Sequence, residues 1–304
     1  MPLYEGSEEK TICLSAVLSM LLTIFSLCFP KLCSLEISSA YQRVISSLLP
    51  SLFISSVLSS LINKTKLRDA LKRIFCPPLC KLLKTSDEQS LAFLFSVFFG
   101  YPIGVTVLED QYQSKLISQR QYKRSLLFSN NCGAAFIFSY LSLFPAVGRI
   151  GAVIIFLSQL FSAFVIARLS FRAEDTAFAP RKVSYSEPSL AQALCGSVKN
   201  TCKNLCYMGG FVILFSCLSK AVIFFFPFLP AKGVYFIGEI SGFFQSFSPD
   251  LPLCAAASGF GGLSVYLQSL ALSPTLSKTP SYVLYKLLNS FLMAVFSLLA
   301  ILIL

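Results

Sequence analysis

One carboxylate interrupts an apolar stretch of this 304-residue chain: Glu239 stands between two glycines, in Gly238-Glu239-Ile240-Ser241-Gly242. An unpaired carboxylate is costly in an apolar environment, so it is expected to be protonated, paired or close to water. Such a group could bind a coupling cation or shuttle a proton. The alternative is a residue at the membrane interface that only caps a short helix. We favour the functional role.

Other apolar stretches are interrupted by small or polar residues at Gly100-Tyr101-Pro102, Asn130-Asn131 and Gly261-Gly262. A half-helix that ends inside a bilayer leaves backbone groups that only protein or a wet cavity can satisfy. Its N–H end favours carboxylates and its C=O end favours cations. If the interruptions meet, they form a polar site, although the asparagines could instead bond between helices. The predicted substrate-binding residues are Gly100, Tyr101, Pro102, Gly104, Asn130, Asn131, Gly133, Glu239, Ser241, Ser258, Gly261 and Gly262.

The chain has no histidine, which excludes Ser-His and Cys-His nucleophiles, His-ligated metals and imidazole proton shuttles. Most of its eleven cysteines lie in apolar runs and none forms a C-x-x-C pair, so we interpret them as packing residues. No G-x-x-x-x-G-K-[ST] motif is present. We therefore expect no enzyme, no ATP-driven motor, no cofactor and no metal ion.

The composition identifies the class of protein that must position these residues. Apolar residues make up 55% of the chain and charged residues only 13%, whereas soluble domains carry about 25% charged residues. The net charge of +11 comes from basic residues between the apolar runs. That pattern is typical of the positive-inside rule and not of a nucleic-acid-binding face.

The expected fold is an all-α, polytopic membrane protein with about seven transmembrane helices. The runs assigned to them are residues 11–29, 40–62, 125–144, 148–167, 205–226, 251–272 and 283–304. Two shorter runs, 91–108 and 233–247, are each broken around a Gly-x-x-x-Gly pattern and are expected to form re-entrant helical hairpins. The alternative is that these glycines only allow helices to pack closely against each other.

Both halves of the chain contain these parts in one order, which predicts a repeat. The expected domains are an N-terminal helix (1–36), a first repeat (37–170), a basic cytoplasmic loop with an amphipathic helix (171–204), and a second repeat (205–304). Each repeat starts with a span opening at Pro50 or at Gly209-Gly210. With a cytoplasmic N-terminus, most of the 25 Lys and Arg residues are cytoplasmic, Lys286 among them, and Arg43 lies on the other side. The repeats are then inverted, as in many secondary transporters.

Five strings in collinear order resemble the sporulation integral membrane protein YlbJ (SpoVV) family, which is similar to concentrative nucleoside transporters with their nucleoside-recognition gate segments. They are residues 49–53, 100–104, 128–133, 209–211 and 261–265, the last with Gln268. The resemblance covers the chain from about Leu48 onwards. It implies a role in endospore formation, in which dipicolinic acid moves from the mother cell across the mother-cell-derived outer forespore membrane. The chain lacks the family's proline after Gly133, where it has Ala134, so a softer break or another ligand is expected.

The leading functional hypothesis is a secondary transporter of a small carboxylate, dipicolinic acid in first place, during endospore formation. Its expected partners are the solute, the lipid bilayer and a coupling cation or proton. Two alternatives stay open: a permease for nucleosides or other small solutes, and a sporulation scaffold in the membrane that transports nothing.

Overall fold

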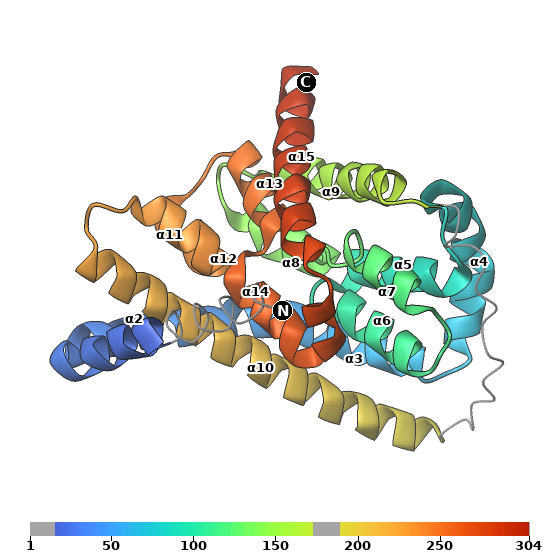
Figure 1. Ribbon diagram of the computed structural model, residues 1–304, viewed down its shortest axis with the longest axis horizontal. Helices are drawn as coiled ribbons and strands as arrows, with labels where there is room; N and C mark the ends of the chain where they lie inside the picture. The colour runs from blue at the N-terminus through green and yellow to red at the C-terminus, as the bar shows by residue number, and fades with distance from the viewer. Residues whose placement is uncertain (1–15, 173–188, 304) are drawn as a thin grey trace, which may run out of the picture.

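The computed structural model describes residues 16–172 and 189–303, and in these ranges every regular element is helical (Figure 1). The fold is that of an all-α membrane protein, as expected. Five helices or pairs of helices are long and apolar enough to cross a membrane: Pro30–Asn63, Gly148–Leu169, Leu190–Phe225, Leu251–Leu272 and Ser281–Ile303. The expected cytoplasmic N-terminus, the start of the first expected span and most of the expected basic loop lie outside the described residues.

The first of these is continuous through α2 (Pro30–Arg43), a π-helical turn η1 (Val44–Leu48) and α3 (Leu49–Asn63). Pro50 sits in the first turn of α3, directly after the π-turn, so the wider turn accommodates the missing N–H donor. The proline therefore does not open a new span. The boundary expected between residues 36 and 37 falls inside α2, and the described part of the preceding helix covers Ala16–Cys28.

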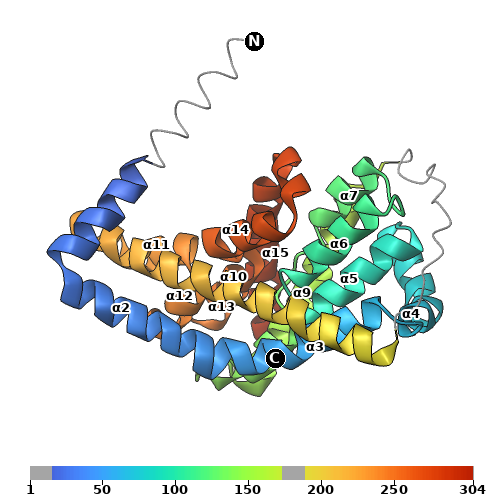
Figure 2. The same ribbon diagram turned by 90° about the horizontal axis from the view of Figure 1, so that it is seen from below.

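A second long helix, α10 (Leu190–Phe225), corrects another expected boundary. The amphipathic helix expected before residue 205 and the span expected after it are one continuous helix of 36 residues. Gly209 and Gly210 lie in its middle and do not break it. Gly209 allows close packing, because an added Cβ there would lie 3.3 Å from Val44 Cγ1. Figure 2 shows α10 running beside α2 and α3.

The basic stretch between residues 63 and 88 contains helix α4 (Leu67–Leu83). It is held to α5 (Asp87–Phe99) by buried Glu88, which accepts from the side chains of Arg68, Lys72 and Gln111. α5 begins at a capping box made by Ser86 and Gln89.

Both short broken runs are helical hairpins. α5 turns back at Gly100–Pro102 into α6 (Ile103–Gln113), where an added Cβ on Gly104 would lie 2.5 Å from Ser96 Cβ. In the second half, α11 (Ala231–Gly238) turns back at Glu239 into α12 (Ile240–Phe247). The ring centroids of Tyr235 and Phe247 are only 5.8 Å apart although twelve residues separate them in the sequence, so the chain folds back on itself.

The run expected to form a single span over residues 125–144 is divided among three elements. They are α7 (Gln119–Leu126), α8 (Ala134–Ser139) and the 3₁₀ turn η2 (Leu141–Leu143), with an irregular segment before Gly133. The matching run in the second half consists of α13 (Leu251–Phe260) and α14 (Gly262–Leu272), separated at Gly261. After these come the unbroken helices α9 (Gly148–Leu169) and α15 (Ser281–Ile303), which pack against each other. The two halves therefore present the same order of elements.

Candidate functional site

A narrow cavity of about 30 Å³ lies where the interrupted helices meet. The interruptions at Tyr101, Gly133 and Glu239 contribute to its walls. The helix that follows the fourth interruption, at Gly261, contributes as well. The lining residues are Leu48, Leu52, Tyr101, Gly133, Phe136, Met208, Val212, Glu239, Ile240, Ser241, Val265 and Gln268. A cavity of this size holds one or two water molecules and no larger solute.

Glycines allow the interruptions to touch in the same way in both halves. In the first half, a Cβ added to Gly133 would lie 2.9 Å from the Cα of Gly100. In the second half, a Cβ added to Gly262 would lie 3.3 Å from the carbonyl oxygen of Gly238. Each hairpin turn therefore packs its backbone against the interruption of the following span. Gly100 and Gly262 also have φ values of +81° and +77°, which favour glycine.

Glu239 is 2% exposed and caps the N-terminus of α12. Its carboxylate accepts from the backbone N–H groups of Ser241 at 2.9 Å and Gly242 at 2.6 Å, and from the Ser241 hydroxyl at 2.8 Å. Glu239 therefore caps a short helix, as in the alternative considered from the sequence. It does so in the buried wall of the cavity and not at an exposed position. The protein's own carboxylate occupies the N–H end that we expected to attract a substrate carboxylate.

Tyr101 projects into this cavity from the α5–α6 turn. Its hydroxyl is buried and has no nitrogen or oxygen partner among the described residues. The thiol of Cys132 lies beside it, which is a weak hydrogen-bonding group. A solute with an acceptor group could therefore bond to Tyr101 without breaking a strong existing hydrogen bond.

The two asparagines have different surroundings. Asn131 donates through Nδ2 to Ser96 Oγ at 2.9 Å and to the Phe128 carbonyl at 2.7 Å, so it holds the irregular segment against α5. Asn130 donates to Ser269 Oγ at 3.1 Å and to the Tyr282 hydroxyl, while its buried Oδ1 has no partner among the described residues. The chain has Ala134 and no proline after Gly133, and the interruption is nevertheless present, because α8 starts directly after Gly133.

The remaining predicted residues shape the walls and do not line the cavity. Pro102 forms a cis peptide with Tyr101, and Gly104 packs against Ser96 and the Ser129 carbonyl. Ser258 donates to the carbonyl of Cys254 within α13 at 2.8 Å, and Gly261 ends that helix. Of the twelve predicted residues, the cavity brings together Tyr101, Gly133, Glu239 and Ser241.

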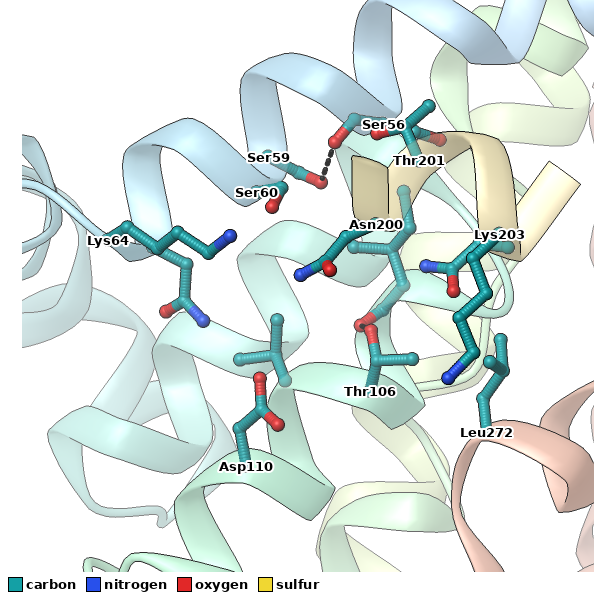
Figure 3. Close-up of a pocket in the computed structure, with 14 residues that line it drawn as sticks. Ser56, Ser59, Ser60, Lys64, Thr106, Asp110, Asn200, Thr201, Lys203 and Leu272 are labelled. Carbon is teal, nitrogen blue, oxygen red and sulfur yellow. Dashed lines mark hydrogen bonds between the residues drawn. The ribbon is translucent and has the colours of Figure 1, made fainter. Parts of the chain in front are cut away.

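A wider, polar cavity of about 230 Å³ lies on one side of the narrow one, between α3, α6 and α10 (Figure 3). Ser56, Ser59 and Ser60 of α3 contribute hydroxyls to its wall. Its charged side chains are Lys64, Asp110 and Lys203, and Asn63, Asn200 and Asn204 add amides. Basic residues outnumber acidic ones in this wall.

A third cavity, of about 430 Å³, lies on the other side of the narrow one. It contains Arg43, which is 6% exposed and was not expected inside the protein. The Arg43 guanidinium donates to Ser39 at 3.0 Å, Gln245 at 3.1 Å and Ser216 at 2.7 Å. The polar lining residues are Ser39, Gln42, Arg43, Ser46, Ser47, Tyr140 and Gln245.

The three cavities follow one another along two adjacent helices. On the first helix, residues 39–47 line the third cavity, Leu48 and Leu52 the narrow one, and residues 56–64 the one in Figure 3. On α10 the positions at intervals of four are Asn200, Asn204, Met208, Val212 and Ser216. These side chains are polar beside the cavity of Figure 3, apolar at the narrow cavity, and polar again at Ser216, which bonds to Arg43. The lining residues of the first helix change in the same order. Sixteen residues of α-helix span about 24 Å, close to the hydrocarbon thickness of about 30 Å.

Sequence reasoning missed two charged residues of this region. Arg43 was assigned to the non-cytoplasmic side and Lys286 to the cytoplasmic side, but both are buried, at 6% and 4% exposure. Lys286 donates to the Asn130 carbonyl at 2.8 Å. A charge near the end of an apolar run is normally a topology signal, so the sequence contains no sign of their burial.

Among the cysteines in the described residues, Cys76, Cys132, Cys217 and Cys254 are buried, whereas Cys28, Cys195, Cys202 and Cys206 are exposed. Burial raises the pKa of Cys76 to about 12 and that of Cys80 to about 11 in α4. Both side chains therefore remain thiols at neutral pH, and a thiol is a poor nucleophile and metal ligand.

These features define an all-helical membrane protein with a buried, narrow and mostly apolar site, which contains Tyr101 and Glu239, between two wider polar cavities. Comparison with protein-family models, with curated proteins and with solved structures gives no match. The resemblance to the YlbJ family therefore remains an expectation from the sequence strings.

Proposed function

We propose that the protein is a secondary transporter that moves a small anionic solute by alternating access. The observation that carries the proposal is the sequence of three cavities along α2–α3 and α10. Two polar cavities approach each other from opposite directions, and between them lie the apolar side chains of Leu48, Leu52, Met208 and Val212. Such a barrier prevents free diffusion, and helix interruptions beside it are places where backbone geometry can change.

The charges favour an anion as the solute. Lys64 and Lys203 outnumber Asp110 in one wide cavity. Arg43 is the charged residue lining the other among the described residues, and it also pairs with Glu36 at 3.8 Å. A cleft with one predominant sign of charge concentrates solutes of the opposite sign. Tyr101 and Gln268 can offer hydrogen bonds and an aromatic face at the barrier. A small aromatic carboxylate such as dipicolinate combines these requirements, and we propose it as the first solute to test, with a role in endospore formation.

The test is uptake of labelled dipicolinate and labelled uridine by proteoliposomes containing the purified protein. Tyr101→Phe removes a hydroxyl without a strong partner, and we expect uptake to fall about tenfold with unchanged folding. Tyr207→Phe on the exposed side of α10 is the matched control and should transport normally. Asn131→Ala is a poor probe, because Asn131 holds the segment in place.

Other outcomes would assign the protein to another class. Uptake of uridine in preference to dipicolinate would indicate a nucleoside permease with the same architecture. Absence of uptake of either solute under any ion gradient, with a folded protein, would favour the scaffold hypothesis and end the proposal.

A further inference from the structure

Lys286 is a buried amine without a counter-ion. It projects from α15, is 4% exposed, and its one hydrogen bond goes to the carbonyl oxygen of Asn130 at 2.8 Å. Among the described residues, no carboxylate lies within ion-pair distance of its Nζ. A buried ammonium ion without an anion is strongly unfavourable, whereas a neutral amine or an ion pair is tolerated.

The groups around Lys286 are neutral. Its hydrogen bond goes to the irregular segment between α7 and α8, which also supplies the Cys132 thiol. That thiol lies beside the Tyr101 hydroxyl, in the wall of the narrow cavity. One turn away on α15, Asn289 bonds to Ser162 of α9 and to the Gly259 carbonyl of α13, and Tyr282 bonds to Asn130. Glu239 lies beyond Tyr101, in the same cavity.

Polar groups extend from Lys286 toward the cavity of Figure 3. Asn130 bonds to both Ser269 and Tyr282. One helical turn further along the chain, Ser273 bonds to Tyr122 and to the buried carboxylate of Glu109. Glu109 and Ser273 are the chain neighbours of Asp110 and Leu272, which line that cavity. These hydroxyl, amide and carboxylate groups make the region between Lys286 and that cavity polar rather than apolar.

We propose, on the basis of the proposed function, that Lys286 couples the movement of the solute to the movement of protons. Its amine is neutral while no solute is bound, and it binds one proton with each anionic solute. The proton comes from water in the cavity of Figure 3 and forms the ammonium ion on Nζ. The bound anion balances this charge across the Ser129–Gly133 segment. When the anion leaves on the other side, the proton leaves with it, so one proton crosses per solute.

Proteoliposomes with a pH-sensitive dye inside test this coupling with labelled dipicolinate as the solute. For wild type we expect the interior to acidify by about one proton per dipicolinate taken up, and an inward proton gradient to drive accumulation. Lys286→Met should lower uptake about tenfold or more and remove the effect of the proton gradient. Lys220→Met in α10, at a half-buried lysine, is the matched control and should change uptake by no more than about twofold.

Lys286→Arg separates coupling from folding, because arginine stays protonated. This variant should still exchange internal for external dipicolinate, since the charge persists, but proton-driven net uptake should be lost. Uptake by wild type without proton movement, or gradient-driven uptake by Lys286→Met, would overturn the coupling proposal and leave the transport function intact. If wild type takes up no dipicolinate, the proposed solute and this coupling fail together.

Discussion

Gly100 and Gly133 touch backbone to backbone, so that a Cβ added to Gly100 would lie 2.7 Å from the Cα of Gly133. We expect Gly100→Ala and Gly133→Ala to destabilise the protein by about 1–3 kcal/mol, because the backbone must separate and Gly100 has φ +81°. Thermal unfolding in detergent measures this. Gly210→Ala is the control, since nothing lies within 4 Å of an added Cβ there, and alanine should be neutral or stabilising in α10. Equal stability of all three variants would contradict the close packing.

Glu239 links the cavity to the N-terminus of α12. Replacement by alanine removes three accepted hydrogen bonds, and we expect a loss of about 1–3 kcal/mol in the free energy of unfolding. Glu239→Gln keeps one acceptor oxygen and should lose less. Asp250→Ala at the exposed N-cap of α13 provides the comparison, with a smaller loss expected. A loss at Glu239 no larger than at Asp250 would show that burial adds nothing to this cap.

Leu52 and Met208 line the narrow cavity from two adjacent helices, α3 and α10. Alanine at either position enlarges the space between the two wide cavities, so we expect a leak of small solutes that needs no gradient of a coupling ion. Efflux of a preloaded neutral solute, such as glycerol, from proteoliposomes measures the leak. Leu58→Ala, at a 46% exposed position of α3, should not leak. If proteoliposomes with the Leu52→Ala protein do not leak glycerol, the barrier lies elsewhere in the protein.

The thiols of α4 should react slowly at neutral pH. Because alkylation requires the thiolate, modification of Cys80 by iodoacetamide should increase as the pH rises toward about 11, and that of Cys76 toward about 12. Mass spectrometry after timed alkylation reads each site, with the exposed Cys195 as an internal reference. Rapid modification of Cys76 in folded protein at pH 7 would mean that α4 separates from α5.

Much of the architecture could be predicted because glycine, proline and buried polar residues act locally. Helices are interrupted at Gly100, Pro102, Gly133 and Gly261, and these residue types favour an interruption whatever the tertiary structure. The hairpin at residues 100–102 and the break after α13 could therefore be predicted. Gly209 and Gly210 show the limit of this reasoning. A helix interior tolerates glycine when neighbouring helices pack against it, and that packing is not visible in a local pattern.

The charged residues of the site depended on tertiary structure. Arg43 and Lys286 resemble ordinary topology signals, and only the fold shows that Ser216 and the Asn130 carbonyl receive their hydrogen bonds. Asn131 resembled a ligand-binding amide, but the partners that it finds in Ser96 and Phe128 are structural. Residue type thus indicated which segments meet at the narrow cavity, and the side-chain partners distinguish Asn131 from Tyr101.

The shortness of the apolar layer around Leu48 and Leu52 has an electrical consequence. In the proposed transporter, water and ions entering the two wide cavities would bring each bulk solution close to this layer, and a membrane voltage would then fall mainly across about two helical turns. A charge that moves only this distance experiences nearly the full field, worth about 2.3 kcal/mol per 100 mV. The local field there would then be stronger than that in the surrounding lipid.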